Sequence, residues 1–250
     1  MKENNFEVVV MAAGKGTRMG NDLPKVLTPL KGRPMMSYLL DAIKESGVCD
    51  RPTIVIGKGA EQVKETFGPD NQYVLQEEQL GTGHAVMVTE KFLQDATDVL
   101  VLSGDHPLIG SETIKSLTDT HLNSGGVLTI ATVMTEDFKD WRSELKSMAK
   151  VIRNDEGKVI EILEKEDFTP ETENIKEINP SYMCFKADWL WESLKKLGKA
   201  DTSLNEYPLP ALVNMAFKQG HGVTTLVITD TKQGLGINTS EQLESIENLL

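Results

Sequence analysis

The chain has 250 residues, of which 39% are hydrophobic and 26% are charged, an ordinary composition for one large globular domain. Its net charge of −12 argues against a nucleic-acid partner, which would need a broad basic face. No apolar run approaches the roughly 18 residues that span a bilayer, and the first residues lack the apolar core of a signal peptide. Because its two cysteines lie far apart, we expect reduced thiols, a cytoplasmic location and no membrane partner.

Strand and helix patterns alternate over the first half of the chain. The apolar run 6–11 predicts a strand, and residues 34–46 repeat apolar side chains at helical spacing until Gly47 ends the pattern. The same patterns predict strands at 53–56, 73–75 and 99–102, and helices at 60–67, 84–93 and 111–122. This order predicts a parallel sheet with helices on both faces.

After Gly125 and Gly126 the pattern changes to strands joined by turns. Strands are predicted at 127–134, 149–153, 159–163, 182–185 and 223–228, and helices at 189–197 and 206–219. We therefore expect an α/β fold with a mixed, mostly parallel sheet whose later strands build a substrate half. The domain would span residues 1–229, and residues 230–250 would form a helical tail in which Thr239 and Gln242 make a capping box.

The loop after the first strand has the composition of a phosphate-binding loop. The sequence M-A-A-G-K-G-T-R-M occupies residues 11–19, and L-P-K follows at 23–25. Glycine lets the backbone approach a ligand, and successive N–H groups form a concave anion site. Lys15, Arg18 and Lys25 supply the local positive charge that a triphosphate needs. The order matches neither the dinucleotide fingerprint nor the Walker loop, so we expect a third kind of phosphate loop.

Two further motifs follow predicted strands. Q-x-x-Q-L-G-T-G-H-A at 76–85 combines the donor and acceptor of the Gln76 amide with Gly81, which suits a pyrimidine base. In S-G-D-H-P-L at 103–108, Asp105 follows an apolar strand at the edge where open α/β sheets bind ligands. A carboxylate there suits Mg²⁺, whereas imidazole does not, so we expect His106 outside the coordination shell or at the surface. On its own, Gln76 would be expected as an exposed polar residue, and Asp105 as the cap of a helix or turn. The motifs around these two residues favour a ligand-binding site instead.

Together these motifs resemble the sugar-1-phosphate nucleotidyltransferases. The chain looks like the uridyltransferase (pyrophosphorylase) domain of the bacterial bifunctional N-acetylglucosamine-1-phosphate uridyltransferase/glucosamine-1-phosphate acetyltransferases. The resemblance runs from about residue 8 to residue 229 and includes segments 162–167, 177–179 and 206–207. It implies a Rossmann-like nucleotidyltransferase fold and Mg²⁺-dependent uridylyl transfer from UTP to a sugar-1-phosphate. The expected acceptor is N-acetylglucosamine-1-phosphate, and the products would be UDP-N-acetylglucosamine and pyrophosphate.

The resemblance also implies roles for single residues. The nucleotide would be held by Met11, Ala12, Ala13, Gly14, Lys15, Lys25, Gln76, Gly81 and Thr82. The sugar would be held by Ser103, Gly104, Ala149, Glu164, Asn179 and Thr202. Catalysis would depend on Arg18, Lys25 and Asp105, with Mg²⁺ bound by Asp105 and Thr202.

The chain departs from the family pattern mainly in the sugar half. Ser103 replaces a tyrosine, Ala149 a glycine, Pro180-Ser181 a Thr-Gly pair and Thr202 a metal-binding asparagine, and the connection 135–147 is longer than usual. The preferred sugar and the oligomeric state therefore stay open. Alternatives are a pyrophosphorylase for another sugar-1-phosphate or for dTTP, and a non-catalytic sugar-nucleotide-binding regulator.

The acetyltransferase half of the bifunctional enzymes is built from hexapeptide repeats, and this sequence contains none. We therefore expect no left-handed β-helix domain and a free-standing transferase without acetyltransferase activity. A fragment of a longer protein would look the same.

Overall fold

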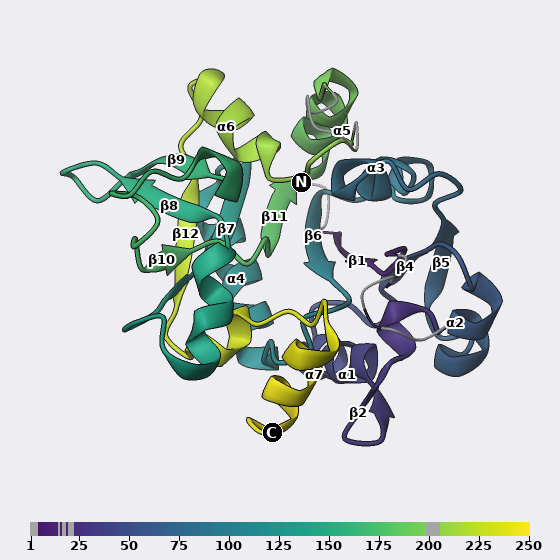
Figure 1. Cartoon of the computed structure of the whole chain (residues 1–250). Helices are drawn as coiled ribbons and strands as arrows, with labels where there is room; N and C mark the ends of the chain where they lie inside the picture. Colours follow the sequence, from purple (N-terminus) through teal and green to yellow (C-terminus); the bar gives the residue numbers. More distant parts are fainter. Residues whose placement is uncertain (1–4, 15, 17–18, 20–22, 199–205) are drawn as a thin grey trace.

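A mixed sheet, with ten strands in the part of the chain that the structure describes, runs through the molecule, and helices cover both of its faces (Figure 1). The structure is a computed structural model that describes residues 5–14, 16, 19, 23–198 and 206–250. Within these ranges no helix is long and apolar enough to cross a membrane.

One half of the sheet is parallel and the other half is mixed. The four parallel neighbours are, in spatial order, β5 (Gln72–Leu75), β4 (Thr53–Ile56), β1 (Phe6–Met11) and β6 (Asp98–Ser103). The mixed half consists of β11 (Met183–Lys186), β7 (Leu128–Met134), β12 (Thr224–Ile228), β10 (Glu177–Ile178), β8 (Lys150–Arg153) and β9 (Val159–Leu163). β11 runs antiparallel to both β6 and β7, so it joins the two halves into one sheet. A separate ribbon pairs β2 (Pro29–Leu30) with β3 (Arg33–Pro34).

Helices bury apolar side chains against each face of the sheet. One cluster packs under α1 (Met35–Ser46), α4 (Ser111–Ser124) and α7 (Ser240–Glu247). The other packs under α3 (Thr82–Met87), α5 (Ala187–Lys196) and α6 (Ala211–Lys218). The other helices among the described residues are α2 (Ala60–Phe67) and the 3₁₀ turns η2 (Lys25–Leu27), η3 (Glu90–Phe92), η4 (Asp140–Ser147), η5 (Lys165–Asp167) and η6 (Thr231–Gly234). The α1 pattern is typical, because Met35, Leu39 and Ile43 are fully buried at helical spacing.

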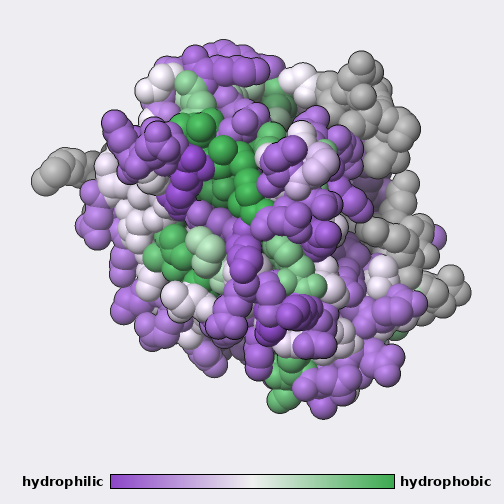
Figure 2. All heavy atoms as spheres, turned by 60° about the vertical axis from the view of Figure 1, so that its left-hand side comes forward, coloured by the Kyte–Doolittle hydropathy of each residue, from purple (hydrophilic) through white to green (hydrophobic). Residues whose placement is uncertain are grey.

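The surface is largely hydrophilic, in keeping with the acidic composition. Figure 2 shows a face on which hydrophobic areas are separated by hydrophilic ones. The large hydrophobic side chains exposed among the described residues come from separate elements: Leu23, Leu75, Phe92, Met134, Ile160, Val227 and Leu250.

The predicted α/β fold is confirmed, and most predicted elements lie within two residues of their observed bounds. Two helix predictions are wrong in extent. The helix predicted at 84–93 begins at Thr82 and ends at Met87, where the Thr89 hydroxyl donates to the Val86 carbonyl at 2.7 Å and the 3₁₀ turn η3 follows. The helix predicted at 206–219 begins only at Ala211, because Pro208 and Pro210 disfavour helical backbone in the residues before them.

The predicted capping box at the start of α7 forms in part. The Thr239 hydroxyl accepts a hydrogen bond from the Gln242 backbone N–H at 3.3 Å, as predicted. The Gln242 side chain instead accepts from the backbone N–H of Asn238 at 2.7 Å, one residue before the cap. The predicted tail also contributes buried side chains to the first core cluster, including Leu235, Ile237 and Ile246.

A charged pair fixes the small strands of the mixed half. The buried Glu177 carboxylate on β10 accepts two hydrogen bonds from Arg153 on β8, at 2.7 and 2.5 Å, and a third from Thr132 on β7 at 2.6 Å. Burial alone would raise the pKa of Glu177, but these hydrogen bonds more than offset it, so the pKa lies below its ordinary value. The pair therefore holds the strand that leads directly to Asn179.

Candidate active site

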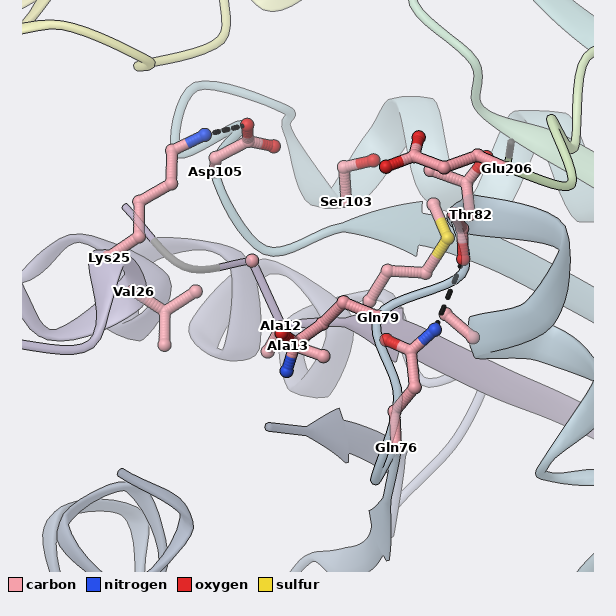
Figure 3. Close-up of a pocket in the computed structure, with 14 residues that line it drawn as sticks. Ala12, Ala13, Lys25, Val26, Gln76, Gln79, Thr82, Ser103, Asp105 and Glu206 are labelled. Atoms are coloured by element: carbon pink, nitrogen blue, oxygen red, sulfur yellow. Dashed lines mark hydrogen bonds and ion pairs between the residues drawn. The ribbon is translucent and has the colours of Figure 1, made fainter. Parts of the chain in front are cut away.

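A cavity of about 420 Å³ opens at the carboxyl edge of the parallel strands (Figure 3). This is the edge at which open α/β sheets bind ligands. The residues that line it are Met11, Ala12, Ala13, Gly14, Lys25, Val26, Gln76, Gln79, Gly81, Thr82, Ala85, Ser103, Asp105 and Glu206. Most of them come from three segments that the sequence singles out separately: the end of β1 with the loop after it, the segment from β5 into α3, and the end of β6. Glu206 comes from the segment before α6.

The loop after β1 forms one wall of the cavity through its backbone. The Ala12 N–H donates to the Val55 carbonyl at 2.8 Å, which holds the loop against β4. Gly16 has a φ of +63°, and a Cβ there would lie 3.0 Å from the Cβ of Lys25. Glycine is therefore needed at this position both for its backbone angle and for the approach to Lys25. Lys15 and Arg18 lie outside the described residues, and their predicted roles stay predictions.

At one end of the cavity the Gln76 amide is held in one orientation. Its side-chain nitrogen lies 3.1 Å from the Gly81 carbonyl oxygen and 3.1 Å from Nδ1 of His84. Both amide hydrogens are therefore used, and His84 Nδ1 must act as the acceptor. No described residue donates to the Gln76 oxygen, which Figure 3 shows turned toward the side of the cavity formed by Ala12 and Ala13. The cavity thus presents a hydrogen-bond acceptor at this end.

The backbone of residues 207–209 is clamped onto the loop that follows Gln76. The Tyr207 N–H donates to the Leu80 carbonyl at 2.8 Å, and the Gly83 N–H donates to the Tyr207 carbonyl at 2.7 Å. Gly81 has a φ of +98°, and a Cβ there would lie 2.8 Å from the Tyr207 carbonyl oxygen. The Thr82 hydroxyl accepts from the Leu209 N–H at 2.9 Å, so this oxygen already has a protein partner. These contacts give the end of the cavity near Gln76 a rigid wall.

At the other end, Lys25 lies between two oxygen-bearing side chains. Its ammonium group contacts the Asp105 carboxylate, and it donates to the side-chain oxygen of Asn238 at 2.9 Å. Burial raises the pKa of Asp105, but the charge and hydrogen bond of Lys25, together with His106, more than offset it, so that the pKa lies below its ordinary value. The Ile237 N–H donates to the Asp105 carbonyl at 2.9 Å and holds the two segments together. Lys25, Asp105 and Asn238 therefore meet at one point, which we call the reaction centre.

Asn238 is a candidate site residue that the sequence did not indicate. The sequence places Asn238 in the predicted helical tail. It lies 213 positions from Lys25 in the chain, but the fold brings the two side chains into hydrogen-bond contact. The signal that could have located it is a short apolar stretch containing Leu235 and Ile237, which ends in a polar side chain just before the helix cap.

His106 lies behind Asp105 and not at the surface. Its Nδ1 is 2.7 Å from the Tyr182 hydroxyl, which itself donates to the Gln233 carbonyl at 2.6 Å. The phenol oxygen must therefore accept from Nδ1–H, which assigns the imidazole tautomer. Its Nε2 is 3.7 Å from the nearer Asp105 oxygen. Because the side chain is buried, the alternative prediction of a surface position is wrong.

In the sugar half, Asn179 has an unused buried donor. The residue is 2% exposed, its backbone N–H donates to the Ala149 carbonyl at 2.9 Å, and its side-chain oxygen accepts from the Ser181 N–H at 2.9 Å. The side-chain nitrogen is buried without an acceptor among the described residues. Such a donor costs about 1–3 kcal/mol when it is buried and unpaired. Ser181, which replaces a family glycine, has the strained φ of +65°.

The comparisons with known proteins agree with this geometry. Residues 8–206 match the family model of the MobA-like NTP transferase domain. This chain belongs to that family. It is 38% identical over 245 residues to the bifunctional protein GlmU of Alkaliphilus oremlandii and 37% identical over 244 residues to GlmU of Exiguobacterium sibiricum. The alignments cover 98% and 97% of this chain and 52% of each relative, so the chain spans about half the length of these proteins.

Two solved structures show the same fold. A CMP:2-keto-3-deoxy-manno-octonic acid synthetase complexed with CTP superposes with a TM-score of 0.72 at 15% identity, covering 98% of both chains. A putative glucose-1-phosphate thymidylyltransferase from Bacillus anthracis gives 0.73 at 18% identity, covering 98% of this chain and 94% of that one. The predicted nucleotidyltransferase fold, the resemblance to the uridyltransferase half of the bifunctional enzymes and the assignment as a nucleotidyltransferase are thereby confirmed.

In this nucleotidyltransferase, more of the predicted nucleotide-binding residues than of the predicted sugar-binding residues line the cavity. Of the sugar set, Ser103 lines the cavity, whereas Gly104 faces the core, where a Cβ would lie 3.1 Å from Met36 and Val26. Ala149, Glu164 and Asn179 lie outside the lining, and Thr202 is outside the described residues. Partial desolvation and then the neighbouring carboxylates of Glu166 and Asp167 raise the pKa of Glu164. The roles of the six predicted sugar residues in sugar binding stay predictions.

Proposed function

We propose that this nucleotidyltransferase transfers a uridylyl group from UTP to a sugar-1-phosphate and releases pyrophosphate. The observation that carries the proposal is a single cavity with the acceptor oxygen of Gln76 at one end and the Lys25–Asp105 pair at the other. A nucleoside triphosphate has the matching polarity, with a base at one end and phosphates at the other. The expected acceptor is N-acetylglucosamine-1-phosphate, as the family resemblance implies.

The orientation of Gln76 supports selection of a uracil-type base. Both amide hydrogens are bonded to Gly81 and His84, so the side chain can offer only its oxygen to a base. Uracil and thymine have an N3–H donor for that oxygen and guanine has an N1–H, whereas cytosine and adenine present a lone pair on the corresponding edge. A buried site built around one such bond discriminates strongly against a base that lacks the donor. Gln76 does not separate UTP from dTTP, and the choice of UTP rests on the resemblance.

The transfer itself needs positioning and charge neutralisation. A phosphate oxygen of the sugar-1-phosphate attacks the α-phosphorus, a new P–O bond forms, and the bond to the β-phosphate breaks as pyrophosphate leaves. Because the nucleophile is already an anion, no general base is needed. Lys25, which is mostly buried at the reaction centre, would neutralise charge that develops on the phosphates.

The residues at the reaction centre fit the Mg²⁺ that the family implies. The Asp105 carboxylate and the Asn238 amide oxygen already converge on one cation, the Lys25 ammonium. Both are hard oxygen ligands of the kind that Mg²⁺ prefers, and Mg²⁺ commonly takes one or two protein ligands together with substrate phosphates. We propose that Asp105 and Asn238 would hold the ion. When bound, it would neutralise charge on the transferring phosphates.

Asn179 supports the presence of a sugar beside the nucleotide. Its buried, unpartnered side-chain nitrogen can donate to a hydroxyl or carbonyl oxygen of a sugar phosphate.

The protein has two free cysteines, Cys49 and Cys184, in the part that the structure describes, which favours the reducing cytoplasm as the place of the reaction.

The test is pyrophosphate release from UTP, dTTP and CTP, each with the 1-phosphates of N-acetylglucosamine, glucosamine and glucose, with and without Mg²⁺. We expect release from UTP that requires both a sugar-1-phosphate and Mg²⁺, and the Asp105→Asn variant should lose the response to Mg²⁺. A preference for dTTP or another sugar would establish the alternative pyrophosphorylases. Binding of UDP-N-acetylglucosamine with no release under any condition would favour the regulator.

A further inference from the structure

The position of Asn238 is set by a side chain outside the cavity. Asn238 lies in the short stretch between η6 and α7, and its side-chain oxygen accepts from Lys25. Its backbone N–H donates to the side-chain oxygen of Gln242 at 2.7 Å. The Gln242 backbone N–H in turn donates to the Thr239 hydroxyl at 3.3 Å. Gln242 therefore fixes the backbone from which Asn238 reaches the reaction centre.

The other end of the Gln242 amide is held from a distant segment. Its side-chain nitrogen donates to the Glu144 carboxylate at 2.7 Å, across a sequence separation of 98 residues. Because a carboxylate only accepts and a backbone N–H only donates, the two partners together permit one orientation of the amide. Glu144 thus keeps the Gln242 oxygen directed at Asn238.

Glu144 has a firm base in the fold. It lies in η4, within the connection 135–147. Its neighbour Leu145 is fully buried in the core cluster that also contains Ile246 of α7. Glu144 therefore reaches Gln242 from a segment that is anchored in the same core cluster as the tail helix.

We propose that Glu144 and Gln242 are positioning residues for Asn238 in the transfer reaction, an inference that rests on the proposed function. Neither side chain lines the cavity, so both act through Asn238. The path runs from the Glu144 carboxylate through the Gln242 amide and the Asn238 backbone to the Lys25 ammonium. Partners one layer behind a metal or reaction site commonly change affinity or activity by about 10- to 100-fold when they are altered.

A charge-swap series tests this path. Gln242→Glu keeps an acceptor for the Asn238 N–H but places a second carboxylate against Glu144. We expect two quantities to fall about 10-fold or more: kcat/KM for pyrophosphate release and the affinity for Mn²⁺. The Mn²⁺ affinity is measured by electron paramagnetic resonance, with Mn²⁺ alone and with UTP. The double variant Gln242→Glu/Glu144→Gln restores a donor opposite the new carboxylate and should recover most of both losses. Glu244→Gln, an exposed change on the same helix, is the matched control and should stay within about twofold of the parent.

Thermal unfolding of each variant separates positioning from stability. The inference is overturned if Gln242→Glu leaves both kcat/KM and Mn²⁺ affinity unchanged, if only the unfolding temperature moves, or if the double variant recovers nothing. Should Gln242→Glu not fold, Glu144→Ala removes the outer partner alone, and an effect no larger than that of Glu244→Gln would overturn the inference. If the parent protein releases no pyrophosphate with any substrate, the proposed function fails, while the Mn²⁺ titrations still decide on the path.

Discussion

Replacing Gln76 with leucine tests whether this side chain selects the base. Leucine has nearly the same size but offers no oxygen to the uracil N3–H. Gln76 is 3% exposed, so the donor of the base would be left without a partner in a buried site. That costs about 1–3 kcal/mol, which corresponds to roughly 5- to 150-fold in kcat/KM for UTP. CTP should lose little, because the lone pair of its N3 would no longer face an oxygen, and the ratio of UTP to CTP should therefore narrow by at least about fivefold.

The assay is steady-state pyrophosphate release with UTP and with CTP at a fixed concentration of N-acetylglucosamine-1-phosphate. His84→Phe is a graded companion, since it keeps the Gln76 oxygen but removes one of the two acceptors that hold its nitrogen at 3.1 Å. It should narrow the same ratio by a smaller factor. A parallel fall for UTP and CTP in Gln76→Leu would mean that Gln76 does not read the base, and unchanged kinetics for both would place the base elsewhere.

Three further predictions follow from the same structure. Lys25→Ala should lower kcat by about 100-fold or more with an unchanged circular dichroism spectrum, because it removes the charge at the reaction centre, and near-normal turnover would exclude Lys25 from it. Ala149→Gly should raise kcat/KM for N-acetylglucosamine-1-phosphate if the extra methyl group narrows the sugar site, and an unchanged value would show that it does not. Arg153→Met should lower the free energy of unfolding at pH 7.5 by about 2–4 kcal/mol, since it leaves the buried Glu177 carboxylate without its ion-pair partner. In the wild type the lowered pKa of Glu177 gives stability that is complete above its unfolded value and lost only as the pH falls through the folded value. In the variant, burial raises that pKa, so the difference in urea stability should shrink from pH 7.5 to pH 5; a constant difference would contradict the argument.

The sequence predicted features whose signal is local. The buried strand Phe6–Met11 and the loop after it were predictable because β-branched runs and glycines impose their conformations within a few residues. The cavity could be located for the same reason, since Gln76 and Asp105 each follow a strand and parallel strands bring their carboxyl ends to one edge.

Features that depend on contacts between distant segments were not predictable. Asn238 joins the reaction centre through a bond to a residue 213 positions away, and no local pattern marks such a contact. The Gln242 side chain accepts from the Asn238 N–H and does not complete the expected capping box, because the Glu144 carboxylate of a remote turn fixes the other end of its amide. Likewise, the start of α6 was missed because apolar periodicity continues through Pro208 and Pro210, whose backbone constraints decide the boundary.

The attachment of Asn238 to α7 has a consequence for how activity is lost. This helix has eight residues and buries one of them, Ile246, whereas three of the six residues of β1 and five of the six residues of β6 are buried. Segments with few buried contacts open locally at a lower free energy than the whole molecule unfolds. Opening of α7 alone would break the Gln242 bond that sets the Asn238 backbone, while every strand of the sheet stays paired. As denaturant is added, turnover should therefore disappear before the secondary structure does, and amide hydrogen exchange in α7 should report the free energy of that first step.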